Sequence, residues 1–303
     1  MDDAEDILFS LVVCTRDRAT SLKRMLDSVV AAKKPSRSWE IIIVDNGSSD
    51  RTQDVIRKYV NRLPIHSVIA PLPGLSNARN VGVGESRGKF IVWTDDDVTI
   101  DSDFLCAYAE RFSSDTENVV FGGFARPVYE QPTKSWLLKN EQELTALLAI
   151  RDSTHRRCLE RDYLPFGLNF AVRADVQRSF LYDPSLGVAP GRRRGGEEIA
   201  VISSILESGY GGVWVWNAKV QHHIPLVRQR ARYVWSYYRA SGFDWPPFKV
   251  GYGPLGTMQI AALAFRELLK ITFKISFGFG RWVTNLRDLA AVAGMYDRRR
   301  SGT

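Results

Sequence analysis

Three consecutive aspartates, Asp95, Asp96 and Asp97, follow an apolar stretch at Lys89–Trp93. Three carboxylates that lie close together repel one another unless a cation lies among them. Hard divalent cations such as Mg²⁺ and Mn²⁺ prefer oxygen ligands, and Mg²⁺ usually binds through one or two carboxylates plus substrate phosphates. We therefore interpret the triplet as a candidate metal site for a phosphate-bearing substrate. A solvated acidic turn or a helix N-cap is the alternative interpretation.

Two further residues have the chemistry to bind a nucleotide beside such a metal. Asp45 ends the apolar run EIIIV and precedes a tight turn, where its carboxylate can accept hydrogen bonds from a base or a ribose. The alternative role of Asp45 is that of an Asx-type turn former. Arg79, in GLSNARNVG, can clamp a phosphate through paired hydrogen bonds. A structural arginine is the commoner case for any single arginine.

A candidate general base follows a glycine pair much later in the chain. Glu197 and Glu198 come directly after Gly195-Gly196, where a carboxylate held in a pocket can take a proton from an acceptor hydroxyl. Acidic residues in a first helical turn are also favoured by the helix dipole alone. His222 and His223 offer an imidazole to a metal or to phosphates, although a single histidine is more often structural.

Strands and helices must bring these side chains together. Apolar runs typical of buried strands lie at Phe9–Cys14, Glu40–Val44, Ile65–Ala70, Lys89–Trp93, Val119–Phe124, Phe166–Val172 and Val213–Trp216. Helical spacing of apolar residues predicts helices near 22–29, Leu75–Glu85, Asp103–Phe112, Trp136–Ile150 and from Glu197 to Glu207. This alternation predicts a mostly parallel sheet with helices on both faces. Ligands bind at the carboxyl ends of such strands, where Thr15, Arg16, Asp45 and Asp95–Asp97 should gather.

The composition is that of a folded α/β protein rather than a disordered one. The chain has 303 residues, 45% of them hydrophobic and 25% charged. Its three cysteines form no CxxC pair, which favours free thiols in a reducing compartment. The acidic N-terminus does not resemble a signal peptide, and no charge-free window of about 20 residues suits a bilayer span. We therefore expect the chemistry to take place in the cytoplasm.

Positive charge is concentrated in the last quarter of the chain. From Leu226 to Thr303 there are 13 Lys/Arg and 4 Asp/Glu, a net charge of +9, whereas the whole chain carries +7. Within the apolar stretch Met258–Phe277, Arg266, Lys270 and Lys274 recur at helical spacing on one face.

Such a basic amphipathic helix is typical of a membrane-surface element. Anionic lipids would attract it by about 1 kcal/mol per cation. The alternative is a helix packed on the catalytic domain or in a dimer interface. Nucleic-acid binding is disfavoured because the charges lie among long apolar residues rather than in a polar groove.

The order of these motifs resembles glycosyltransferase family 2, whose members adopt the GT-A fold. The stretches that carry the resemblance are LVVCTRDRATSLKRMLDSV, EIIIVDNGSSDRT, PGLSNARNVGVGESRGKFIVWTDDDV, PFGLNFAVRADV, GGEEIAVISSILESGYG and VQHHIP. They run from about Phe9 to Pro225. The resemblance implies an α/β, Rossmann-like catalytic domain over 1–225, with a nucleotide-binding half near 1–125 and an acceptor half near 126–225. Residues 226–303 would form a basic helical extension.

The resemblance also implies a role for each matching residue. On the nucleotide side, Thr15 and Arg16 would border the nucleotide, Asp45 would hold the base and Arg79 would place the donor. In the aspartate triplet, Asp95 would face the ribose, Asp96 would fill the variable middle position and Asp97 would ligate Mn²⁺ or Mg²⁺. His222 would touch the metal or the diphosphate. The family often has Glu-Asp where this chain has Glu197-Glu198. Glu198 is therefore the candidate base, with the choice between the two glutamates open.

The implied reaction is an inverting transfer of a hexosyl or related sugar from a nucleotide diphosphate sugar. We expect a UDP-sugar donor and a hydroxyl acceptor on a glycan or lipid-linked glycan. A peripheral position on the inner face of the cytoplasmic membrane would suit the basic extension. The alternatives are a nucleotidyltransferase, which the absence of glycine from CTRDR disfavours, and an inactive nucleotide-sugar scaffold.

Overall fold

The computed structural model describes residues 6–152, 156–193, 195–244, 253–276 and 282–301. It separates into two compact units. Unit 1 consists of Met1–Val128, Ala149–Pro190 and Gly196–His223. Unit 2 consists of Tyr129–Leu148, Gly191–Gly195 and Ile224–Thr303.

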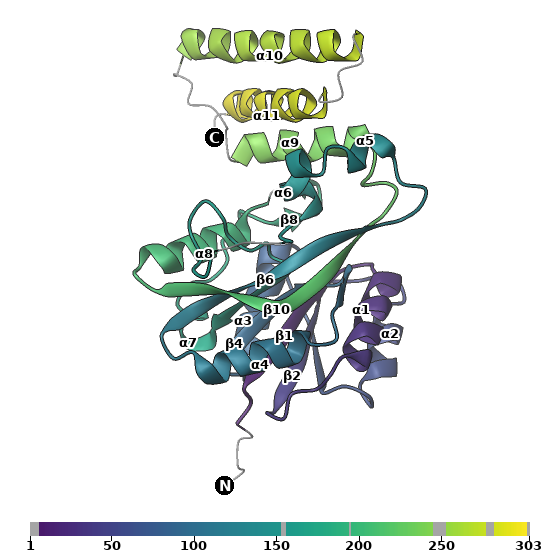
Figure 1. Ribbon diagram of the computed structural model, residues 1–303, viewed down its shortest axis with the longest axis vertical. Helices are drawn as coiled ribbons and strands as arrows, with labels where there is room; N and C mark the ends of the chain where they lie inside the picture. Colours follow the sequence, from purple (N-terminus) through teal and green to yellow (C-terminus); the bar gives the residue numbers. More distant parts are fainter. Residues whose placement is uncertain (1–5, 153–155, 194, 245–252, 277–281, 302–303) are drawn as a thin grey trace. The chain divides into compact units, whose positions relative to one another are not determined.

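A sheet of eight strands, in the order β3-β2-β1-β4-β7-β6-β10-β5, is the centre of unit 1 (Figure 1). Its strands are β1 (Phe9–Thr15), β2 (Trp39–Asp45), β3 (Ile65–Ile69), β4 (Phe90–Asp95), β5 (Val98–Ile100), β6 (Asn118–Tyr129), β7 (Asn169–Arg173) and β10 (Gly211–Ile224). The helices of unit 1 are α1 (Ala19–Ala31), α2 (Thr52–Tyr59), α3 (Leu75–Glu85), α4 (Phe104–Ser114), α7 (Ala174–Gln177) and α8 (Glu197–Glu207). The short strand β8 (Val188–Ala189) also belongs to unit 1, and the short strand β9 (Arg192–Arg193) belongs to unit 2.

The sheet is mixed, with a parallel half and an antiparallel half. Strands β3, β2, β1 and β4 pair in parallel, as the alternation of strands and helices predicts. Strand β7 instead pairs antiparallel with both β4 and β6, and β10 pairs antiparallel with β5. The sequence predicts a mostly parallel sheet, and parallel pairing is confined to the first four strands. Antiparallel neighbours need no helical crossover, and the described residues between β6 and β7 form short helical turns rather than one long helix.

Apolar residues cover both faces of the parallel half. Leu11 and Val13 of β1 pack with Leu22 of α1 on one face. Val12 points to the other face and packs with Trp93 of β4. Burial on both sides explains why β1 is a continuous apolar run rather than an alternating one.

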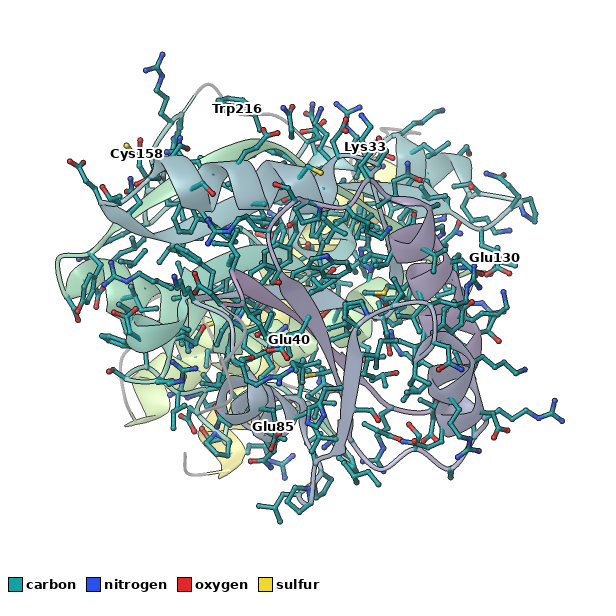
Figure 2. The ribbon with its side chains drawn as sticks, turned by 90° about the horizontal axis from the view of Figure 1, so that it is seen from below. Lys33, Glu40, Glu85, Glu130, Cys158 and Trp216 are labelled. Carbon is teal, nitrogen blue, oxygen red and sulfur yellow. The ribbon has the colours of Figure 1, made fainter. Side chains whose placement is uncertain are left out.

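Strand β2 carries a buried carboxylate at each end, and the two differ in their surroundings. Glu40, near the start of β2, accepts a hydrogen bond of 2.7 Å from Ser10 and one of 2.9 Å from Arg87 Nε. Figure 2 shows Glu40 among the strands of the sheet. Its charge is therefore balanced by a structural ion pair. Asp45 ends the same strand at the opposite edge of the sheet.

The helix predicted at Trp136–Ile150 is wrong as a single element. The chain forms α5 (Ser135–Leu138), a 3₁₀ turn (Gln142–Leu144) and α6 (Thr145–Leu148) instead. Asn140 explains the break, because its side-chain amide donates a hydrogen bond of 2.7 Å to the carbonyl of Trp136. A side chain that occupies a carbonyl four residues earlier competes with helix continuation.

Three longer helices make up most of unit 2. They are α9 (Ala231–Asp244), α10 (Gly253–Ser276) and α11 (Trp282–Ser301), and α11 lies between the other two (Figure 1). None of the helices in the described residues combines the length and the apolar character that crossing a bilayer requires.

Helix α3 packs closely against the sheet at Gly82. A Cβ at Gly82 would lie 2.6 Å from Cγ1 of Val12, whereas a Cβ at Gly84 meets nothing within 4 Å. We expect Gly82→Ala to reduce the free energy of unfolding by about 1–3 kcal/mol, as overpacking does. Gly84→Ala should be neutral or stabilise by up to about 1 kcal/mol. Urea unfolding of both variants checks the pair, and equal stabilities would contradict this packing.

Candidate active site

The aspartate triplet lies where β4 ends and β5 begins. Asp95 is the last residue of β4, and the buried Asp96 and Asp97 form the turn that follows. Thr15, at the end of β1, donates a hydrogen bond of 2.7 Å from Oγ1 to Asp96. Neighbouring parallel strands thus bring Thr15 and the triplet together, as the sequence predicts.

Arg18, which the sequence analysis did not select, contacts two of the three aspartates. Its Nη1 lies 2.9 Å from Asp96 Oδ1 and 2.7 Å from Asp97 Oδ2. Arg16 instead pairs with Asp17 at 3.8 Å, and its side chain is 41% exposed. The sequence did contain a signal for Arg18, because the motif TRDR carries a second arginine two positions after Arg16. Choosing between the two arginines requires the loop conformation, in which Asp17 adopts a φ of 51°.

The buried carboxylates exceed the positive charge nearby. Burial raises the pKa of Asp96 to about 7, with the charge of Asp97 adding to the effect and Arg18 opposing it. Burial also raises the pKa of Glu197 to about 8, with the neighbouring Glu198 adding to it and Arg79 opposing it. Raised carboxyl pKa values mean that removal from water and mutual repulsion outweigh the nearby arginines. The site therefore favours any additional cation.

Arg79 links one aspartate of the triplet to one of the two glutamates. Its side chain is only 4% exposed, and Nη1 lies 3.2 Å from Glu197 Oε1 while Nη2 lies 3.8 Å from Asp95 Oδ1. The guanidinium also lies beside the Tyr182 ring, 5.3 Å from its centroid. Helix α3 delivers Arg79 and helix α8 delivers Glu197, so one buried cation joins three elements. A direct contact of Arg79 with donor phosphates stays a prediction.

The two glutamates at the start of α8 have different surroundings. Glu197 is buried and paired with Arg79, whereas Glu198 is half-buried. The backbone amide of Gly167 donates a hydrogen bond of 3.3 Å to Oε1 of Glu198. Gly196, which precedes them, has a φ of 87°, a conformation that glycine adopts readily. The turn at Gly196 thus positions both carboxylates at the helix N-terminus.

The two histidines point in different directions because they are neighbours on a strand. His222 Nε2 lies 3.7 Å from Asp97 Oδ1, and His223 Nε2 lies 3.1 Å from the hydroxyl of Thr99. Pairing of β10 with β5 sets this arrangement, since His222 lies opposite Val98. Strand β5 was not predicted, and without it the position of His222 could not be derived.

Asp45 is buried at the carboxyl end of β2, and its side chain stabilises the loop that follows this strand. Its carboxylate accepts a hydrogen bond of 2.8 Å from the amide of Ser48 and another from the side chain of Gln53. These contacts are those of the turn-forming alternative. Recognition of a nucleotide base by Asp45 therefore stays a prediction.

The oxygen and nitrogen atoms of these side chains fit a divalent cation that is shared with a substrate. Among the described residues, no cluster of three or more His, Cys, Asp or Glu side chains has metal-binding geometry. Asp97 and His222 approach each other, however, and the excess of negative charge around Asp96 favours a cation. Two protein ligands suffice for Mg²⁺ or Mn²⁺ when water and a diphosphate supply the rest. Such a cation would share Asp97 with Arg18.

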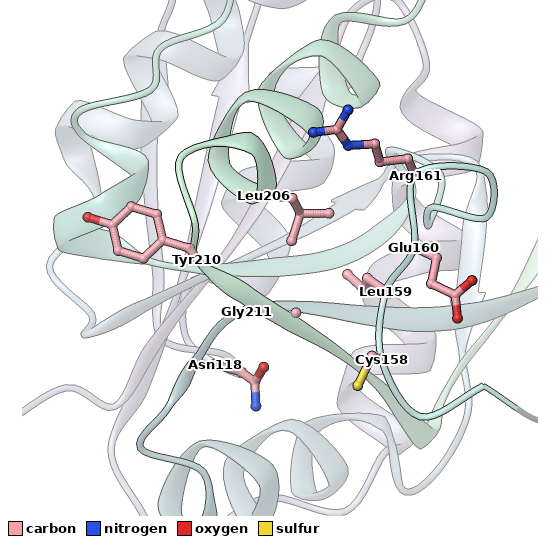
Figure 3. Close-up of a pocket in the computed structure, with 9 residues that line it drawn as sticks. Asn118, Cys158, Leu159, Glu160, Arg161, Leu206, Tyr210 and Gly211 are labelled. Atoms are coloured by element: carbon pink, nitrogen blue, oxygen red, sulfur yellow. The ribbon is translucent and has the colours of Figure 1, made fainter.

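A separate pocket of about 400 Å³ opens elsewhere in unit 1 (Figure 3). Its lining includes Asn118, Leu159, Leu206 and Tyr210, with Cys158 at one side. None of the predicted site residues lines it, so we do not assign it to the candidate active site.

Comparison with known families identifies the group to which this arrangement belongs. The family model described as Glycosyl transferase family 2 matches residues 10–170, which is more than half of the chain. The chain belongs to this family. The match includes the aspartate triplet and Arg79 but ends before the two glutamates and His222.

Curated members of the family are similar to this chain over part of their length. The cholesterol galactosyltransferase of Borreliella burgdorferi is 27% identical over 116 residues, which cover 38% of this chain and 32% of that protein. The poly(ribitol-phosphate) beta-N-acetylglucosaminyltransferase TarS of Staphylococcus aureus is 27% identical over 112 residues, covering 35% of this chain and 20% of TarS. The chain thus matches about a third or less of these two relatives.

Solved structures extend the fold comparison to nearly the whole chain. A crystal structure of S. aureus TarS, residues 1–349, has a TM-score of 0.55 at 14% identity and covers 98% of this chain and 92% of that one. The mannosyltransferase PcManGT of Pyrobaculum calidifontis, in complex with GDP-Man and Mn²⁺, has a TM-score of 0.62 at 16% identity, with 96% and 87% covered. The fold is therefore of the GT-A type.

The pKa of Glu197 predicts how stability depends on pH. An unfolded glutamate has a pKa of about 4.3, whereas burial raises the pKa of Glu197 to about 8. Between these values the folded state holds one more proton than the unfolded state, so the free energy of unfolding falls as pH rises. We expect Glu197→Gln to lose less stability than the wild type between pH 5 and pH 8. Urea unfolding at both pH values measures this difference, and parallel losses would refute it.

Proposed function

We propose that this protein transfers a sugar from a nucleotide diphosphate sugar to a hydroxyl of a glycan or lipid-linked glycan, with inversion at the anomeric carbon. The observation that carries the proposal is the position of Arg79 between Asp95 and Glu197. Arg79 thereby links the candidate donor site to Glu197, the residue that precedes the candidate base Glu198 in the chain. A hexosyl or related sugar on UDP is the proposed donor. The structural neighbour TarS in complex with UDP-GlcNAc supports UDP, whereas PcManGT was solved with GDP-Man.

The donor side of the proposed site is the carboxyl edge of the parallel strands. Asp45 would bind the base, Asp95 the ribose, and Thr15 would hold Asp96 in place. Asp97 and His222 would hold Mn²⁺ or Mg²⁺, which supplies Lewis-acid stabilisation to the departing diphosphate. Arg79 and Arg18 add fixed positive charge at the same edge, where charge develops as the bond breaks.

Glu198 is the proposed general base. Glu197 is engaged by Arg79, whereas Glu198 is less buried and is oriented by the amide of Gly167. As the acceptor oxygen bonds to the anomeric carbon, its proton passes to Glu198. The bond from that carbon to the phosphate oxygen breaks, and its electron pair leaves with the diphosphate. Attack opposite the leaving group inverts the anomeric centre.

The proposed domain division assigns catalysis to residues 1–225 and surface attachment to residues 226–303. The nucleotide would bind to the half near 1–125 and the acceptor to the half near 126–225. We also propose a cytoplasmic location at the inner face of the membrane, where the basic C-terminal region would meet anionic lipid. The net charge of +9 from Leu226 to Thr303 supports this placement.

A donor panel tests the proposal directly. Purified protein is mixed with UDP-, GDP- and other nucleotide sugars in the presence of Mn²⁺ or Mg²⁺, and thermal shift and released nucleoside diphosphate are measured. Metal-dependent release of nucleoside diphosphate from one donor supports glycosyl transfer. Release of pyrophosphate would instead indicate a nucleotidyltransferase, and no binding to any donor would reject the proposal.

Replacement of the proposed base should separate chemistry from donor binding. We expect Glu198→Gln to lower kcat by about 10²–10⁴-fold, the usual contribution of a general base. The thermal shift produced by nucleoside diphosphate should be retained. Glu207→Gln is the matched control, since Glu207 ends the same helix and its side chain is 52% exposed. An unchanged kcat in Glu198→Gln would remove Glu198 from the mechanism.

Replacement of the proposed metal ligand should remove the response to Mn²⁺. We expect Asp97→Asn to weaken Mn²⁺ binding at least tenfold, because a neutral amide replaces the proposed carboxylate ligand. Electron paramagnetic resonance of free Mn²⁺, titrated with protein and nucleoside diphosphate, measures this affinity without turnover. Asp103→Asn, which changes an exposed aspartate, should bind Mn²⁺ as the wild type does. Equal affinities in Asp97→Asn and the wild type would exclude Asp97 as a ligand.

A further inference from the structure

Helix α10 has one apolar face that packs within unit 2. Ile260 of α10 is buried against Val292 and Met295 of α11, and Leu263 and Ala264 pack beside it. The rotation of α10 about its own axis is fixed by this contact.

A buried polar contact holds the same face of α10 toward α11. Glu267 is 1% exposed, and Asn285 of α11 donates a hydrogen bond of 2.6 Å to its Oε2. Arg266 and Lys270 each approach the other carboxylate oxygen to 2.9 Å. Breaking such a contact would leave a buried carboxylate without its partners, which is costly. The opposite face of α10 must therefore point away from α11.

That opposite face is also apolar. Met258, Phe265, Leu268 and Leu269 are between 51% and 69% exposed. Residues 258, 265 and 269 recur at intervals of seven and four, and 268 lies one turn after 265, so they form one stripe along the helix. A contiguous stripe of large apolar side chains is a mark of an interaction surface, whereas single exposed residues are common on any protein.

Positive charge borders this stripe. The side chains of Arg266 and Lys270 are 51% and 47% exposed. The side chain of Lys274, which the sequence placed on the same basic face, lies outside the described residues. An apolar stripe with cations at its border is the pattern of a helix that lies in a membrane interface. A second copy of α10 would instead bring like charges together, so the charge favours anionic lipid.

We propose that the outward face of α10, formed by Met258, Phe265, Leu268 and Leu269, inserts into the interface of an anionic membrane. Arg266 and Lys270, which also pair with Glu267, border that face with half-exposed side chains and present positive charge toward the headgroups, with their stems along apolar surface. The biological purpose of this contact rests on the proposed function, because a lipid-linked acceptor lies in a membrane. The surface itself is independent of the catalytic residues.

Vesicle sedimentation of the full chain tests this surface. The probes are vesicles of phosphatidylcholine mixed with phosphatidylglycerol, and vesicles of phosphatidylcholine alone. We expect the wild type to sediment with the anionic vesicles and to be released by high salt. Phe265→Ser/Leu269→Ser should bind at least tenfold more weakly. Met258→Gln, a milder change at the other end of the stripe, should bind several-fold more weakly.

A matched control and a second measurement make the outcomes distinct. Leu181→Ser changes a leucine that is 57% exposed in unit 1 and should bind vesicles as the wild type does. Equal binding by the wild type and the stripe variants, or no binding by the wild type, overturns the inference. A concentration-dependent dimer that the stripe variants abolish, without vesicle binding, overturns it in favour of a second copy. Nucleoside diphosphate release, measured separately without vesicles, tests the proposed function, so either idea can fail alone.

Discussion

One buried guanidinium constrains the geometry of the candidate active site. Arg79 lies between Asp95 at the end of a strand and Glu197 at the start of a helix, where water is largely excluded. The buried carboxylate of Glu197 is costly to hold without a partner, so α8 must begin where this side chain reaches Arg79, and β4 ends where the partly exposed Asp95 approaches the same cation. Helix α3 must also lie close to the sheet, and Gly82 permits that approach.

The excess of negative charge also involves the loop that follows β1. Arg18 spans Asp96 and Asp97 and leaves the pKa of Asp96 raised, since burial and like charge outweigh a single guanidinium. A region that is short of positive charge is suited to a substrate that arrives with a cation. The negative charges that weaken the isolated site are those that the proposed divalent cation would offset.

The antiparallel half of the sheet and the helices of unit 2 contribute in different ways. Strand β10 runs past the aspartates because it pairs with β5, and that pairing brings His222 toward Asp97. In unit 2, packing against α11 and the buried Glu267 decide which face of α10 is covered. The exposed stripe on α10 thus results from the helix packing, and hydropathy alone does not reveal it.

Local periodicity in the sequence was enough to predict the parallel strands and helix α3. The gathering of Thr15 and the aspartates follows from the rule that neighbouring parallel strands end at one edge of the sheet. The sequence also carried the family motifs. Two further choices needed the folded chain: Arg18 rather than Arg16 meets the triplet, and strand register brings His222, which the family resemblance had singled out, toward Asp97. Those choices depend on loop dihedral angles and strand register. Both are set by contacts between residues distant in sequence, which no local pattern contains.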